Sequence, residues 1–407
     1  MLAFWFKVPL WQRVIGALVL GVITGLIWGP ESEAIKWIGD FFIKSIKMLV
    51  VPLIFFSLVS GVAAIGDLRK LGAMLMFVVT GQIAVWLGLM LGTMIKPGIG
   101  VDTSGIEMGV TPTPAATSWT DMILSIVPES PVQVMADVQV LPLIVFALLI
   151  GIGILMAKEE GAPVAKIFDS GAIVMQKVTM IVMELTPFGV FALMAWVAGS
   201  FGMDALLSLA KLVGLNYLGC LLIIIFIYSS MIRFLAKLPP VDFFRGIVDA
   251  MAVSYSTASS NATLPVTLRC AERNLGVSPS VSSFVISLGA TINMNGTAMY
   301  LGLATLFGAQ IFGVDLSWGD YFMISITATL GAIGAAGIPG AGLIMMALVF
   351  GSVGVPLETI AFVVGVDRIM DMMRTTTNVS GDAAVAVTVA AMTGELDREE
   401  LISADDV

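Results

Sequence analysis

A short charged segment stands inside an otherwise apolar helix near the end of the chain. The segment "DRIMDMMRTTTNVSGD" spans residues 367–382, between the apolar stretches "TIAFVVGV" and "AAVAVTVAAM". At about 100° per helical residue, five of its polar side chains fall within about 80° of one another. They form a polar stripe that consists of Asp367, Asp371, Arg374, Asn378 and Asp382, whereas Arg368 lies off the stripe. A charge at the centre of a bilayer costs at least ~2.5–3.5 kcal/mol, so these groups need mutual pairing or a polar cavity.

The stripe offers both a cationic and an anionic receptor. The planar guanidinium of Arg374 suits a carboxylate, and the carboxylate of Asp371, about one turn earlier, suits an ammonium group. Together they are complementary to an acidic amino acid. The alternative is an internal Asp–Arg ladder, Asp367 with Arg368 or Asp371 with Arg374, that only holds helices together. Binding is the favoured interpretation, because apolar side chains would serve packing better than buried ion pairs.

The composition indicates an all-α polytopic membrane protein. Of the 407 residues, 58% are hydrophobic and only 12% are charged, and the mean hydropathy is +1.01. A soluble protein is roughly a quarter charged, and apolar runs of about 20 residues, long enough to cross a bilayer, recur along this chain. The cysteines, Cys220 and Cys270, indicate neither a disulfide framework nor a zinc site. The lack of histidine removes the usual proton relay.

Six spans are expected before residue 240. The first is expected at about residues 12–29 as a permanent span rather than a cleaved signal peptide. The others cover 41–66, 73–95, 141–157, about 167–199 and about 204–231, and the segments 97–120 and 158–166 are expected to be loops. The positive-inside rule places the basic loops and both chain termini in the cytoplasm. The basic residues in alternate loops are Arg69, Lys70, Lys158, Lys166, Arg233 and Lys237.

Beyond residue 240 the apolar segments are interrupted. The segment 249–270 is broken by "STASSNATLP", and the segment 323–350 is broken by "GAIGAAGIPGAG". The span 286–308 between them contains asparagines and glycines. Broken helices leave backbone groups unpaired, which hydrocarbon does not tolerate unless the break is buried in protein or lines a site. Paired interruptions indicate the binding site of a transporter, with simple packing kinks as the alternative.

Four motifs of the second half carry a resemblance to a known family. They are "SSNATLPVT", "LGATINMNGTA", "GAAGIPGAG" and "DMMRTTTNVSGD", and they cover about residues 250–390. In order and spacing the chain resembles the glutamate transporter family, the dicarboxylate/amino acid:cation symporters. The resemblance implies eight transmembrane helices, two re-entrant helical hairpins with tips at 259–265 and 335–342, inverted repeats and an elevator-type homotrimer. It implies scaffold parts at 1–70 and 101–200, transport parts at 71–100 and 201–393, and an acidic cytoplasmic tail at 394–407.

The resemblance also implies a substrate site under the hairpins. Arg374 would bind the side-chain carboxylate of the substrate and Asp371 its ammonium group, while Asn378 and the hairpin serines would bind its α-carboxylate. The implied substrate-binding residues are Arg374, Asp371, Asn378, Thr375, Thr297, Ser259, Ser260, Ile338 and Gly342.

Two sodium sites are implied in the same way. Oxygen cages with one carboxylate or none suit a small monovalent ion better than calcium. The first site would use Gly289, Asn293, Asn378 and Asp382, and the second would use Thr291, Ala332, Ile333 and Ala335.

The chain departs from the family at a third sodium site. Asn295 stands where relatives have an aspartate, Phe77 where they have a tyrosine, and Gly81 where they have serine or threonine. Of the expected ligands only Thr80 and Asn293 remain. A desolvated cation without its carboxylate loses much of its attraction, so the third site is expected to be lost.

Further departures concern charge near the substrate. Relatives have an arginine at the position of Ala258 or of Met372, and Arg368, one turn earlier, would supply that charge here. Leu301 replaces a glutamate that supports proton and potassium coupling in animal relatives, so such coupling is not expected.

These features predict a secondary active transporter of acidic amino acids, aspartate or glutamate, in the plasma membrane of a prokaryote. Coupling to at most two sodium ions is expected, with no cofactor, no enzymatic activity and no nucleic acid partner; substrate, sodium, membrane lipid and further copies of the chain are the expected partners. A C4-dicarboxylate carrier, a neutral amino acid carrier or a sodium-independent carrier remain alternatives. A channel needs no zwitterion receptor, and an aspartyl protease is disfavoured because the aspartates share one helix with an arginine between them.

Overall fold

The structure is a computed structural model that describes residues 8–63, 68–101, 127–137, 139–335, 337 and 339–398. Within these residues it is helical, apart from connections and one antiparallel bridge between Val277 and Leu396. The predicted all-α class is therefore confirmed. Among the described residues, four stretches are long and apolar enough to cross a membrane: Leu10–Ala63, Gly72–Ile95, Pro142–Met183 and Thr186–Ala236. The number of eight crossings stays a prediction.

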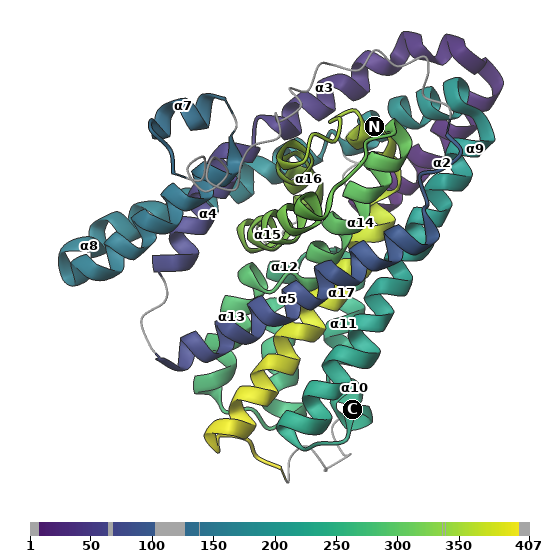
Figure 1. Ribbon diagram of the computed structural model, residues 1–407. Coiled ribbons are helices and arrows are strands. Elements are labelled where there is room, and N and C mark those ends of the chain that lie inside the picture. The colour runs from purple at the N-terminus through teal and green to yellow at the C-terminus, as the bar shows by residue number, and fades with distance from the viewer. Residues whose placement is uncertain are drawn as a thin grey trace.

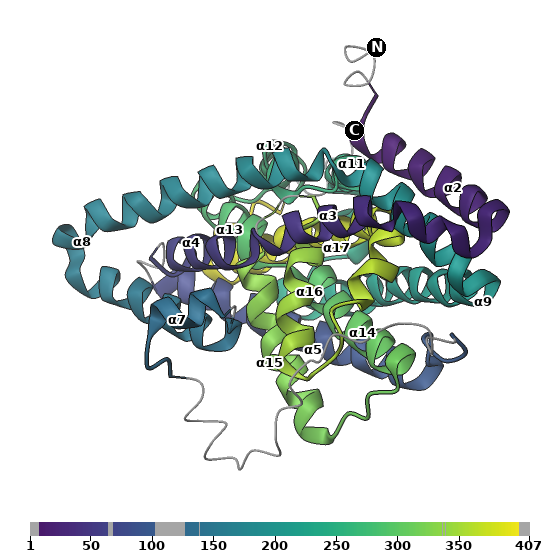
Figure 2. The same cartoon turned by 90° about the horizontal axis from the view of Figure 1, so that it is seen from above.

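In Figure 2, α2 and α9 lie toward one end of the molecule and α4, α7 and the bend of α8 toward the other, whereas α3 and α5 run through the middle. Helix α2 packs against α9, and α4 packs against α8. The elements are α2 (Leu10–Trp28), η1 (Gly29–Ile35), α3 (Lys36–Lys47), α4 (Val50–Ala63), α5 (Leu68–Ile95), α7 (Pro131–Ala136), α8 (Val140–Met183) and α9 (Thr186–Leu222).

Some predicted boundaries in this half are wrong. At Lys158, whose φ is 51° and ψ −124°, two helices that share the label α8 meet at a kink; apart from this residue, the segment 158–166 is helical rather than a loop. Its Lys, Glu and Ala residues are good helix formers. The span predicted at about 167–199 is interrupted where α8 ends and α9 begins with Thr186 and Pro187, since proline favours a helix start. The span predicted at 41–66 is likewise divided between α3 and α4.

The second half forms the middle of the molecule (Figure 1). Helix α9 continues through two π-helical segments, η2 (Ile223–Tyr228) and η3 (Met231–Ala236). The remaining elements are α10 (Pro240–Gly246), α11 (Val248–Thr257), α12 (Ser260–Arg269), η4 (Cys270–Asn274), α13 (Pro279–Ile292), α14 (Asn295–Phe312), α15 (Trp318–Gly334), α16 (Ala341–Ser352) and α17 (Thr359–Thr393).

The two interrupted segments are helical hairpins. In the first hairpin, α11 and α12 are separated at Ala258, which has a φ of 51°, and Ser259, which caps α12. The break therefore lies at Ala258 and Ser259, at the very start of the predicted range 259–265, and Pro265 lies inside α12. In the second hairpin, α15 and α16 are separated by residues 335–340, and Gly340 supplies a φ of 79°. This position favours glycine because an L side chain rarely adopts it.

The breaks of the two hairpins touch each other. The hydroxyl of Ser259 donates to the carbonyl oxygen of Gly337 at 2.7 Å, and the backbone N–H of Asn261 donates to the same oxygen at 3.1 Å. A side chain at Gly337 would meet the carbonyl oxygen of Ala290 at 2.4 Å, so the tip of the second hairpin also lies against the end of α13.

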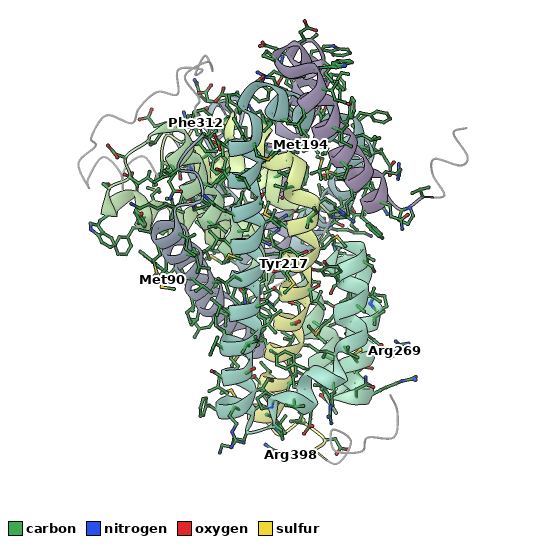
Figure 3. All side chains as sticks on the ribbon, turned by 90° about the vertical axis from the view of Figure 1, so that its right-hand side faces the viewer. Met90, Met194, Tyr217, Arg269, Phe312 and Arg398 are labelled. Carbon is green, nitrogen blue, oxygen red and sulfur yellow. The ribbon has the colours of Figure 1, made fainter. Side chains whose placement is uncertain are left out.

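Helix α17 runs through the centre of the fold. It is buried over almost its whole length and packs against α9, α11, α13 and α14. Tyr217 of α9 lies beside it at mid-height (Figure 3) and donates to the carbonyl oxygen of Ile369 at 3.0 Å. The apolar residues at both ends of α17 fill these helix contacts, so the polar stripe faces protein and not lipid.

Candidate functional site

Arg374 is the centre of a buried ion cluster on α17. Its Nη2 atom donates to Asp367 Oδ1 at 2.8 Å and to Asp371 Oδ1 at 2.9 Å. The guanidinium carbon lies 3.7 Å from the ring centre of Tyr300, whose hydroxyl donates to Asp367 Oδ1 at 2.9 Å. The cation is thus held between two carboxylates and the face of an aromatic ring.

Two nitrogens of this guanidinium remain without a partner. The Nε and Nη1 atoms of Arg374 are buried and have no hydrogen-bond partner within the described part of the chain. A Cβ atom at Gly342 would lie 3.2 Å from Nη1, which is a tight contact, so the glycine lets the second hairpin pack closely against the guanidinium. Native proteins rarely leave buried donors unpaired, and such a group usually marks a missing ligand or water.

Asp371 links the ion cluster to the second hairpin. Its Oδ1 atom accepts from Arg374, and its Oδ2 atom accepts from the backbone N–H of Gly340 at 2.9 Å. Each carboxylate oxygen can accept a further hydrogen bond, so Asp371 still offers acceptor capacity to an ammonium group.

The ladder considered as the alternative is therefore present in part. Arg374 pairs with Asp371, which is one of the two pairs predicted for such a ladder. Asp367 pairs with Arg374 and not with Arg368, so the other predicted pair is absent from the described ion pairs. A ladder alone does not account for the unpaired donors, because a purely structural arginine would have its N–H groups satisfied.

Asn378 joins α17 to the unwound connection between α13 and α14. Its Oδ1 atom accepts from the backbone N–H of Gly296 at 2.8 Å, and its Nδ2 atom lies 3.4 Å from the hydroxyl of Thr297. The backbone N–H of Gly296 would otherwise lack a partner at the start of α14. Asn378 and Thr297, both predicted in the substrate site, are therefore neighbours.

The remaining predicted substrate residues are also accounted for. Ser259, Ser260 and Thr375 are buried, and the hydroxyl of Ser259 is used in the contact between the hairpin tips. Ile338 lies outside the residues that the structure describes.

The residues of the first predicted sodium site converge on Asp382. Asn293 Nδ2 donates to Asp382 Oδ1 at 2.8 Å and to the carbonyl oxygen of Asn378 at 3.2 Å. A Cβ atom at Gly289 would lie 2.4 Å from Asp382 Oδ1, so its backbone passes beside the carboxylate. The Oδ1 atom of Asn293 is buried without a donor among the described residues, which leaves an oxygen free for a cation.

The second predicted sodium site lies at the break of the second hairpin. Ala332 and Ile333 belong to the last turn of α15, and the N–H of Ala335 donates to the carbonyl oxygen of Ala332 at 3.2 Å. Thr291 belongs to the end of α13, which contacts α15. The structure thus places both predicted segments on contacting helices.

The predicted third site is filled by a neutral amide. Asn295 Nδ2 donates to the hydroxyls of Thr80 and Tyr228, at 3.0 Å in both cases. Its Oδ1 atom would be 3.4 Å from a Cβ atom at Gly81, while Phe77 lies beside Gly289. The hydroxyl oxygens of Thr80 and Tyr228 thus each accept a hydrogen bond from the amide, and the loss of this site stays a prediction.

Sequence reasoning missed three contributors to these clusters. Tyr300, Tyr228 and the backbone N–H of Gly340 each contact a predicted site residue. Tyr228 carried a weak signal, as the single hydroxyl in "IIIFIY". A backbone N–H carries no signal, because every residue except proline has one.

Comparisons with known proteins test the resemblance that the four motifs carry. A family model described as "Sodium:dicarboxylate symporter family" matches residues 10–392. A "Proton/sodium-glutamate symport protein" of Geobacillus stearothermophilus is 33% identical over 96% of this chain and 96% of its own length. A "C4-dicarboxylate transport protein" of Bacillus subtilis (strain 168) is 35% identical, covering 96% and 95%. A "Proton/glutamate-aspartate symporter" of Escherichia coli (strain K12) is 35% identical, covering 97% and 94%. The resemblance carried by the four motifs is thereby confirmed: the chain belongs to the sodium:dicarboxylate symporter family, whose members are membrane transporters.

Proposed function

We propose that the chain is a symporter of acidic amino acids in the plasma membrane of a prokaryote. The observation that carries the proposal is the buried guanidinium of Arg374, with unpaired Nε and Nη1 atoms beside the carboxylate of Asp371. An aspartate or glutamate molecule supplies the matching groups, a carboxylate for the guanidinium and an ammonium group for Asp371. The names of the relatives in Geobacillus stearothermophilus and Escherichia coli support the same substrate class.

The other proposed contacts bind the remaining polar groups of the zwitterionic substrate. Asn378, Thr375 and Thr297 face the substrate from α17 and α14, and the hairpins contribute from both sides. Ser259 and Asn261 both bind the carbonyl oxygen of Gly337, and we propose that this contact between the hairpin tips opens when the substrate enters. The proposed hairpin contributors are Ser259, Ser260, Ile338 and Gly342.

Two sodium sites are proposed as the source of coupling. The first uses the Asp382 carboxylate and oxygens of Gly289, Asn293 and Asn378, and the second uses carbonyl oxygens of Thr291, Ala332, Ile333 and Ala335. The unpaired Asn293 Oδ1 atom supports the first site. The amide of Asn295 in the third position supports a ceiling of two ions.

The assembly proposed for transport is a homotrimer in a lipid bilayer with both termini in the cytoplasm. Residues 1–70 and 101–200 form the scaffold parts, and residues 71–100 and 201–393 form the transport parts that move as an elevator. The separate packing partners of α2, α4 and α8 at the ends of the molecule support this division (Figure 2).

A C4-dicarboxylate carrier is the second candidate. It is favoured by the observation that both Asp371 oxygens already accept hydrogen bonds, from Arg374 and Gly340. An Asp371 that only holds these two groups would not require a substrate ammonium. The relative named as a C4-dicarboxylate transport protein is as similar to this chain as the glutamate symporters are.

Uptake into proteoliposomes separates the two candidates. Labelled aspartate, glutamate and succinate are offered with and without an inward sodium gradient, to the parent protein, to Arg374→Ala and to the control Arg269→Ala, an exposed position of α12. We expect gradient-driven uptake of aspartate or glutamate by the parent and the control, and a loss of about 100-fold or more for Arg374→Ala. Uptake of succinate without aspartate or glutamate would contradict the proposal.

A further inference from the structure

Arg368 is a second buried arginine of α17, and no carboxylate neutralises it directly. Its side chain is 7% exposed, and its Nη2 atom donates to the carbonyl oxygen of Thr257, at the break of the first hairpin, at 3.1 Å. Its Nε and Nη1 atoms are buried without partners, and no carboxylate of the described residues lies within ion-pair distance. A buried cation without a counter-anion is unfavourable, so this position calls for an anionic ligand.

The donor geometry makes Arg368 the better carboxylate receptor of the two arginines. A guanidinium has two edges with parallel N–H groups, one formed by Nε with Nη2 and one by Nη1 with Nη2. In Arg374 both hydrogens of Nη2 are used, by Asp367 and Asp371, so neither edge is complete. In Arg368 only one hydrogen of Nη2 is used, by Thr257, so one edge stays complete for a carboxylate.

The summed charge of the side chains around Arg368 also favours the binding of an anionic substrate. Asp367, Arg368, Asp371 and Arg374 lie within eight residues of α17, and Arg368 is close enough to the two aspartates to interact with them electrostatically. With Arg368 the four charges sum to zero, whereas without it the cluster would carry an excess negative charge. An anionic substrate would then be repelled from a buried site of low dielectric.

We propose that Arg368 is a specificity-determining residue that binds the second carboxylate of the substrate, on the side of the first hairpin. Arg374 binds the other carboxylate through its unpaired N–H groups on the side of the second hairpin, where Gly342 lies against it. The two arginines are separated by about 9 Å along the helix axis, with Asp371 between them for the ammonium group. A substrate with one carboxylate leaves one arginine unpaired, so the pair selects dicarboxylic ligands. This assignment rests on the proposed function and deepens it.

The test removes one carboxylate from the ligand and one guanidinium from the protein. Parent, Arg368→Met, Arg368→Lys and Arg374→Met are titrated in detergent with aspartate, with β-alanine, which lacks the α-carboxylate, and with alanine, which lacks the side-chain carboxylate. Arg269→Met is the control: Arg269 lies at the exposed lower end of the molecule (Figure 3) and its side chain is 55% exposed. Melting temperatures without ligand report on folding.

We expect Arg368→Met to weaken aspartate binding by about 30-fold or more, and Arg368→Lys to weaken it less, since lysine keeps the charge but not the fork. In one of the two variants, Arg368→Met or Arg374→Met, the preference for aspartate over β-alanine should collapse. In the other variant, the preference for aspartate over alanine should collapse. The melting temperature of Arg368→Met should stay close to that of the parent, because removing a buried cation without an ion-pair partner offsets the loss of its hydrogen bond to Thr257 and of its charge.

Two results would overturn the assignment. One is an aspartate affinity of Arg368→Met within about threefold of the parent. The other is an equal loss for all three ligands, which would mean that Arg368 only supports the break of the first hairpin through Thr257. If the parent binds succinate but not aspartate, only the proposed function is overturned. Arg368 is then tested in the same way, by comparing the binding of succinate with that of propionate, which has one carboxylate.

Discussion

The number of coupled sodium ions is the property on which the amide of Asn295 bears most directly. Substrate affinity rises with sodium concentration through mass action, and each coupled ion adds one unit to the slope of log affinity against log sodium. One unit corresponds to about 1.36 kcal/mol for a tenfold change in sodium. The perturbation is therefore a sodium titration, carried out on the parent and on Asn295→Asp.

The magnitude follows from counting the proposed sites that the structure leaves open. The sites proposed at Asp382 and at the break of the second hairpin would hold two ions, whereas the proposed third position has the amide of Asn295, which donates to Thr80 and Tyr228, in place of a carboxylate. Two ions give at most about 2.7 kcal/mol, or about 100-fold in affinity, for a tenfold change in sodium. A third ion would raise this to about 1,000-fold.

Asn295→Asp alone should leave the slope at two or below. It removes two hydrogen bonds of about 1 kcal/mol each and buries a carboxylate, while Phe77 and Gly81 still withhold oxygens. The triple variant Phe77→Tyr, Gly81→Ser, Asn295→Asp should raise the slope by one. Calorimetry across sodium concentrations below saturation, with reversal potentials in proteoliposomes, gives the slopes. A parent slope near three would refute the reasoning, since an amide or a water would then be replacing the carboxylate.

Three further substitutions probe single contacts. Asp371→Asn should weaken aspartate binding by about 30-fold or more and succinate binding by less than about threefold; equal losses in calorimetry would mean that Asp371 only holds Arg374 and Gly340. Gly342→Ala should weaken aspartate binding by about tenfold or more, because its Cβ would crowd Arg374 Nη1 at 3.2 Å. Gly351→Ala, in the same helix with open space around it, is its control and should bind as the parent does. Tyr228→Phe should lower the unfolding free energy by about 1–3 kcal/mol, because a buried amide N–H of Asn295 loses its acceptor; a changed sodium slope would contradict this purely structural role.

The polar stripe and the helix breaks were predictable because both are local patterns. Charged residues at helical spacing inside an apolar segment indicate either a binding site or internal ion pairs. Small residues around a proline, as at Pro339, disrupt a helix wherever they occur. Within the residues that it describes, the structure confirms an all-helical chain and shows helix breaks in both segments. It moves the first break to Ala258, because the left-handed turn there and the cap at Ser259 decide the helix end, and Pro265 does not.

The partners of these residues were not predictable from the sequence. Asp371 binds the backbone of Gly340, 31 residues earlier in the chain, and Asn295 binds Tyr228, which lies on another helix. Such contacts depend on how helices far apart in the sequence pack together. Pairing on one helix is equally ambiguous, because Asp367 could reach Arg368 or Arg374 and only the packed structure shows that it chooses Arg374.

The carbonyl oxygen of Gly337 accepts hydrogen bonds from two groups of the first hairpin, and we call this connection between the two hairpins the interlock. Gly337 offers one carbonyl oxygen to both Ser259 and the backbone of Asn261, so neither hairpin can withdraw from the tip without releasing the other. Two of the three groups involved are peptide groups, which most substitutions leave in place. Selection can therefore adjust the strength of the interlock at Ser259, but it cannot easily abolish it. Because the hydrogen bond from the backbone of Asn261 survives a substitution of Ser259, a single point mutation rarely removes the whole contact between the two hairpins.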